Sequence, residues 1–278
     1  MQSSLNPKTT SSRILGLAIG IALLLVVAYI LIYWYQPFSE FINNFLSNFL
    51  SELASLFAAI FATLIWGMYE KEDAPKRVWG NFAIGLWLWF AGDITWGYIN
   101  LTYGEVNIGA PDIFWVTSYF FFGRALFSQY KILTQPTQRR LLNWALTVIL
   151  SLLVLILLIF FILTSNNTTS MNILDALVNA FYPAVDVLLS IVALGLARNF
   201  AGGAFAYPWL GLLAFSISDL LYAWLDLSGA YAWSLEQGNL LSTITDVAYF
   251  AAYLVLGLGV LSQWLFLKYG LRASAEKR

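Results

Sequence analysis

The chain contains no cysteine and no histidine. Disulfide bonds, thiol catalysis, haem ligation through His or Cys and the usual zinc sites depend on these residues, so each is excluded. Charged residues are also scarce, at 10% of the sequence, and a net charge of −1 provides no basic surface for nucleic acid. We therefore expect no metal, no cofactor and no nucleic-acid partner.

Apolar residues are abundant instead. They make up 60% of the 278 positions, and the mean hydropathy is +0.74, whereas a soluble domain has roughly 45–50% apolar and about 25% charged residues. A helix needs roughly 20 apolar residues to cross a bilayer. Eight stretches reach this length, approximately 14–35, 45–68, 78–100, 111–133, 141–164, 173–197, 204–227 and 239–268. They predict an all-α integral membrane protein, with one membrane domain over 1–278 and the lipid bilayer as its partner.

The basic residues predict the orientation of these eight spans. Of the 14 Lys and Arg residues, 13 lie in or next to the terminal segments and the connections after the second, fourth and sixth stretches, and Arg124 is the exception. Lys and Arg accumulate on the cytoplasmic side of membrane proteins. We therefore predict a protein of the inner cell membrane with both termini in the cytoplasm and a short cytoplasmic tail over 269–278.

The two halves of the sequence repeat the same residue types at the same spacing. From an Asp, the offsets +3, +7 and +11 select an aromatic residue, a Tyr and a Gly in both halves: Asp112, Trp115, Tyr119 and Gly123, then Asp246, Tyr249, Tyr253 and Gly257. Gly85 precedes Asp93 by the same eight residues that separate Gly211 from Asp219. Four spans per half predict two parallel four-helix repeats, 14–134 and 135–268, related by an axis along the membrane normal.

Several acidic residues fall inside the predicted spans, where an ionised carboxylate costs roughly 2.5–3.5 kcal/mol. Five of them lie deep, on the outer side of the membrane or near its midplane: Glu52, Asp93, Asp186, Asp219 and Asp246. Asp112 and Asp226 lie at the outer boundary. Arg124 is the single deep base, and we expect it to pair with Asp186 or, failing that, with Asp93.

Five buried carboxyl groups cannot all be ionised and unpaired. They must be protonated, share a proton, bind a cation or contact water, which predicts a polar cavity in the outer half. Its aromatic walls would suit an organic cation, and the candidates are Trp96, Trp115, Tyr119, Tyr222, Tyr249 and Tyr253. The alternative is a structural network of hydrogen bonds between helices, with the outermost aromatic residues forming the usual interfacial belt.

Four short motifs resemble a known family. Residues 111–115 with Tyr119, residues 181–186, residues 218–222 and residues 246–249 are similar to the P-S-x-A-D-x-x-Y, Y-P-x-x-D, A-D-x-x-Y and D-x-x-W segments of that family. These segments occur in the multi-spanning sensory regions that precede bacterial diguanylate cyclases and kinases. The resemblance covers about two thirds of the chain and implies an input module. The sequence ends nine residues after Tyr269, so we expect a stand-alone module, a module separated from its output domain, or a relative with another role. Signalling by a stand-alone module would need a separate cytoplasmic partner.

Three functions remain open from the sequence. The first is a receptor-like sensory module that binds a small, possibly cationic ligand or senses a membrane condition in the cavity of acidic and aromatic residues. The second is a proton- or cation-coupled transporter that uses Asp93, Asp186 and Asp219. The third, a membrane enzyme, would have only a carboxylate pair to use, and we expect no catalytic residues.

Overall fold

The computed structural model describes residues 7–104, 108–133, 146, 148–156, 173–200, 203–228, 230–231 and 240–270. Within these ranges every regular element is helical. The helices are α1 (Pro7–Tyr35), α2 (Glu40–Gly67), α3 (Ala74–Tyr103), α4 (Ala110–Leu133), α6 (Ile173–Asn199), α7 (Tyr207–Leu227), α8 (Leu240–Leu265) and the π-helical turn η2 (Phe266–Gly270). Residues 148–156 are helical as well. The all-α prediction is confirmed for this part of the chain.

Five helical stretches in the described part are long and apolar enough to cross a membrane. They are Thr10–Tyr35, Glu40–Gly67, Leu177–Asn199, Tyr207–Asp226 and Leu240–Gly270. Helices α3 and α4 have the length, but they are rich in Trp, Tyr and Gly and carry charged residues, so their hydropathy is lower. The predicted stretch 141–164 lies largely outside the described residues. The chain thus has the helices of a membrane protein. That it crosses the membrane eight times stays a prediction.

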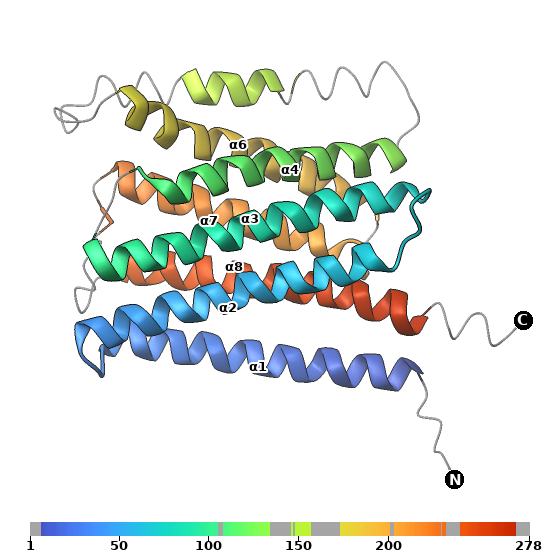
Figure 1. Cartoon of the computed structure of the whole chain (residues 1–278), viewed down its shortest axis with the longest axis horizontal. Coiled ribbons are helices and arrows are strands. Elements are labelled where there is room, and N and C mark those ends of the chain that lie inside the picture. The colour runs from blue at the N-terminus through green and yellow to red at the C-terminus, as the bar shows by residue number, and fades with distance from the viewer. Residues whose placement is uncertain are drawn as a thin grey trace, which may run out of the picture.

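The helices lie side by side along one common direction, and successive helices run in opposite directions (Figure 1). As a result, α1 begins and α8 ends at the same end of the bundle (Figure 1). An even number of passes between these two points agrees with termini on one side of a membrane. Which side this is remains a prediction from the basic residues.

Six of the described helices form a closed ring. Helix α2 packs on α3, α3 on α4, α4 on α6, α6 on α7, α7 on α8, and α8 on α2, while α1 lies outside the ring against α8 and α2. Each contact in the first half has a counterpart four helices later: α2/α3 corresponds to α6/α7, α3/α4 to α7/α8, and α4/α6 to α8/α2. A two-fold axis through the ring would generate this pattern, which is consistent with the predicted parallel repeat.

Polar residues extend α2 and α3 beyond the predicted apolar stretches. Before α2, the side-chain amide of Asn43 donates to the carbonyl of Phe38 (3.0 Å), and its oxygen accepts from the Phe38 N–H (3.3 Å). These bonds fix the backbone of Phe38 against the first turn of the helix, and α2 begins at Glu40 rather than at 45. At the other end of α3, Gly104 has φ 79° and ends the helix, a conformation that glycine adopts without steric cost.

The repeated glycines of α3 and α7 allow close contact with the next helix. A Cβ atom at Gly211 would meet the backbone of Leu256 on α8, and one at Gly85 would meet the ring of Phe122 on α4. Small residues permit this approach between helices in membranes. The spacing of Gly85 and Gly211 in the sequence therefore corresponds to two equivalent helix contacts.

A Gly211→Ala substitution is expected to destabilise the bundle by about 2 kcal/mol, because α7 and α8 must separate to admit one methyl group. Gly123→Ala on α4 is the matched control, since a Cβ there has open space around it and alanine favours the helix by roughly 0.5–1 kcal/mol. Unfolding of both variants in mixed detergent micelles measures the difference. Equal stability of the two variants would contradict the contact.

Candidate functional site

Asp186 on α6 and Asp219 on α7 share one tyrosine at the centre of the ring. The hydroxyl of Tyr119 on α4 lies 3.0 and 3.1 Å from the two carboxyl oxygens of Asp186 and 2.8 Å from Asp219 Oδ2. Asp186 is completely buried and Tyr119 is 3% exposed. The Tyr119 hydroxyl has a single proton, so it cannot be a full donor to both carboxyl groups. One of them must carry a proton, because a carboxylate ion is an acceptor only.

Asp93 on α3 is the centre of a second group. The Tyr253 hydroxyl on α8 donates to its carboxyl oxygens at 2.9 and 3.1 Å, and the indole N–H of Trp115 on α4 donates to Oδ1 at 3.2 Å. The indole of Trp89 in turn donates to the Tyr253 hydroxyl. Ser55 on α2 is a further hydrogen-bond partner of Asp93. Asp93 therefore receives its donors from three neighbouring helices.

Each of the two groups receives its tyrosine from the predicted repeat that does not contain its acid, so the tyrosines are exchanged between the repeats. Tyr119 belongs to the first repeat and binds Asp219 of the second, whereas Tyr253 belongs to the second repeat and binds Asp93 of the first. Both tyrosines occupy the +7 position of the repeated pattern. Trp89 and Phe215, at equivalent positions of α3 and α7, meet edge to face with ring centroids 4.7 Å apart. Asp93, Asp186 and Asp219 with Tyr119 and Tyr253 are called the central carboxyl cluster below.

The acids nearer the predicted outer end also have tyrosine partners. The Tyr182 hydroxyl on α6 donates to Asp112 at 2.6 Å, and the Tyr231 hydroxyl donates to both carboxyl oxygens of Asp246 at 2.9 Å. Burial raises the pKa of Tyr231, which lies between α7 and α8, and the charge of Asp246 raises it further. Tyr231 therefore keeps its proton and remains a donor. Asp226 is exposed on α7.

The remaining predicted aromatic residues surround these groups. The ring of Trp96 lies 6.2 Å from that of Trp115, Tyr222 lies 5.0 Å from Tyr231, and Tyr249 lies 5.2 Å from Tyr253. Tyr249 also reaches Asp219 as a hydrogen-bond partner. The structure thus brings all six predicted aromatic residues next to an acid or next to a residue that binds one.

The expected pairing of Arg124 is wrong. Arg124 is exposed on α4, with its guanidinium group 5.6 Å from the ring centroid of Phe120, whereas Asp186 is fully buried. Five residues separate Arg124 from Tyr119, and a helix turns by about 100° per residue. The arginine therefore points away from the face of α4 that carries the Asp186 contact, and similar depth in the membrane does not bring the two charges together.

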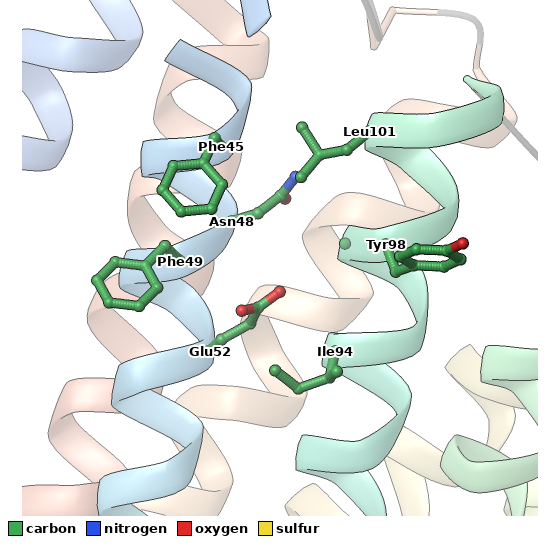
Figure 2. A pocket seen from close by; sticks show the side chains of 8 residues that line it. Phe45, Asn48, Phe49, Glu52, Ile94, Tyr98 and Leu101 are labelled. Carbon is green, nitrogen blue, oxygen red and sulfur yellow. The ribbon is translucent and has the colours of Figure 1, made fainter. Parts of the chain in front are cut away.

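Glu52 lies apart from the central carboxyl cluster. Its side chain points from α2 toward α3 into a lateral pocket of about 200 Å³ (Figure 2). The pocket is lined by Phe45, Asn48, Phe49, Glu52, Ile94, Gly97, Tyr98 and Leu101. A second pocket of about 140 Å³ lies between the same two helices, around Thr63, Gly80 and Trp87. Neither of these two pockets includes Asp93, Asp186 or Asp219, which are instead bonded to tyrosines.

Several partners of the acids were absent from the predicted site, among them Ser55, Tyr182 and Tyr231. Tyr182 had a signal in the sequence, since it precedes Asp186 by four residues and so lies on the same face of α6. Ser55 and Tyr231 come from other elements, and only the packing of the helices brings them near Asp93 and Asp246. Within the described ranges, no three acidic side chains are grouped closely enough to hold a metal ion.

The fold and this arrangement define the class of protein as an all-helical membrane protein with buried carboxyl groups between its helices. Comparison of the chain with protein-family models, with curated proteins and with solved structures finds no match. The resemblance to bacterial sensory regions therefore rests on the four short motifs alone.

Proposed function

We propose that this protein is a receptor-like module that senses a small cation or a membrane condition at the central carboxyl cluster. The proton is the smallest such cation, and the observation that carries the proposal is the shared position of Tyr119 between Asp186 and Asp219. No basic side chain forms an ion pair with these two acids in the described part of the chain. A proton gained or lost there must change the hydrogen bonds that join the helices.

Because the tyrosines are exchanged between the predicted repeats, a change in these hydrogen bonds would alter how the helices of the ring pack. Tyr119 and Tyr253 each bind an acid of the other predicted repeat. Intramembrane acids of this kind commonly mark ion and proton sites. Loss of one of these hydrogen bonds alters the contact between the halves, and a separate cytoplasmic partner would then detect the new arrangement at the ends of the helices.

A proton- or cation-coupled transporter is the second candidate, favoured by the complete burial of Asp186. A transporter must also connect such a site to both faces of the membrane. The pocket nearer the other end of α2 and α3 is lined by Thr63, Trp66, Gly80, Ala83, Ile84 and Trp87, none of which ionises. In the described part of the chain this pocket supplies no ionisable group for a route toward that face, and we therefore prefer the receptor.

Proteoliposomes under an imposed pH gradient separate the two candidates. We expect the wild type and Asp186→Asn to show the same low proton flux, because a receptor binds without carrying its ligand across. We also expect the unfolding temperature of the wild type to depend on pH more strongly than that of Asp219→Asn. A wild-type flux that disappears in Asp186→Asn would instead identify a transporter.

A further inference from the structure

The lateral pocket at Glu52 is lined partly by exposed aromatic side chains. On its walls are Phe45, Phe49 and Tyr98, which are 45%, 42% and 62% exposed. These rings extend from the two helices on either side of the carboxylate (Figure 2). The pocket therefore combines one acidic group with aromatic and aliphatic side chains and opens sideways, toward the space that lipid occupies around a membrane helix.

The Glu52 carboxylate has no partner within the described part of the chain. No group there donates a hydrogen bond to it, and no basic residue contacts it. By contrast, Asp93, Asp112, Asp186, Asp219 and Asp246 all accept bonds from tyrosine. An acid without a partner at membrane depth costs roughly 2.5–3.5 kcal/mol if it is ionised. A bound cation would offset this cost.

Gly97 gives the carboxylate its position. A Cβ atom at this residue would clash with Glu52 Oε1, the flexible end of the side chain, so a larger residue here would make the carboxyl group rotate away from α3. The oxygen is thereby held between the two helices instead of extending along α2 (Figure 2). This contact is a feature of the pocket itself and has no part in the central carboxyl cluster.

We infer that the pocket at Glu52 is a binding site for a single-chain ammonium amphiphile that enters from the membrane. The carboxylate would bind the ammonium group, the rings of Phe45 and Phe49 would contribute cation–π attraction, and the alkyl chain would continue along the exposed apolar faces of α2 and α3. The site shares no residue with the central carboxyl cluster, although the charge of Glu52 acts on Asp93.

The depth of the pocket selects this ligand over an aminophospholipid. Glu52 lies about 10 Å along α2 from residue 45, where the predicted apolar stretch begins, at roughly 1.5 Å per residue. The amine of a phospholipid is attached beyond its phosphate, so it could reach Glu52 only by drawing the phosphate into hydrocarbon. A single-chain amine has no such group and can place its nitrogen at this depth.

Electron paramagnetic resonance of the reconstituted protein tests the site, with a spin-labelled alkylammonium as the probe and the spin-labelled alcohol of equal chain length as its neutral counterpart. We expect the wild type to immobilise the ammonium probe roughly tenfold more strongly than the alcohol. Glu52→Gln should abolish this preference without changing the fold, because the side chain is half-buried and keeps its shape. Gly97→Ala should reduce the preference while leaving the charge in place.

Glu40→Gln is the matched control, since it removes an exposed acid from the same helix and should leave the preference unchanged. Equal immobilisation of both probes by the wild type would overturn the proposal, because the pocket would then be an apolar groove only. A preference that persists in Glu52→Gln would also overturn it. Neither result would affect the flux and stability measurements on Asp186 and Asp219.

Discussion

Replacement of Tyr119 by phenylalanine is expected to lower the free energy of unfolding by about 3 kcal/mol, because it removes the one donor shared by the carboxyl groups of Asp186 and Asp219. The phenylalanine ring fills the same space, so the loss reports the hydroxyl and not a cavity. Unfolding in mixed detergent micelles measures the change. Tyr207→Phe serves as the control, since Tyr207 is 43% exposed and its hydroxyl has no partner to lose in the described part of the chain.

A double-mutant cycle shows whether the Tyr119 hydroxyl acts through Asp219. We expect Tyr119→Phe and Asp219→Asn to be coupled by about 1–2 kcal/mol, as residues in direct contact are. Tyr119→Phe and Asp246→Asn should be additive, because Asp246 is bound by Tyr231 and does not contact Tyr119. Additivity in both cycles would contradict the exchange of tyrosines between the predicted repeats.

The natural chain contains no cysteine, so a thiol reagent reacts only with a cysteine that is introduced. Single introduced cysteines should therefore report the orientation of the chain in the membrane as labelled or unlabelled. A membrane-impermeant maleimide is expected to label Ser39→Cys in intact bacterial cells and Glu72→Cys only after permeabilisation. Both residues are exposed, and they lie at opposite ends of α2. The reason is the concentration of basic residues on one predicted side, which holds the second connection in the cytoplasm.

The reverse labelling pattern would show that the termini lie outside, and labelling of both cysteines in intact cells would show that no membrane separates them. A cell lysate treated with the same maleimide provides the control, because both positions should then react equally. The result is independent of the function of the central carboxyl cluster.

Much of the site follows from local spacing. The +3 and +7 offsets identified Trp115, Tyr119, Tyr249 and Tyr253, since residues at these intervals lie on one face of a helix. All four lie beside the acids in the structure. Their partners were harder to predict, because the donor for Asp219 comes from α4 and the donor for Asp93 comes from α8. Contacts between distant helices depend on the order of the helices in the ring.

Arg124 shows the limit of reasoning from depth. Its distance along α4 placed it level with Asp186, but rotation about the helix axis decides which neighbour a side chain meets. The same limit applies to Glu52, which was grouped with the central acids by depth and instead occupies a separate pocket between α2 and α3. Two side chains at the same depth make contact only if their helices are neighbours and both side chains point toward each other.

The sequence by itself determined the class of this protein. Apolar residues make up 60% of it and form long stretches that favour a membrane, where helices satisfy the hydrogen bonds of the backbone. Through the periodicity of the helix the sequence also identified Tyr119 and Tyr253, the two tyrosines that bind the central acids. Only the tertiary structure decided that the tyrosines are exchanged between the halves, that Arg124 lies outside and that Glu52 stands apart. These facts follow from the packing order and rotation of the helices, which are set by side-chain fit across the whole ring.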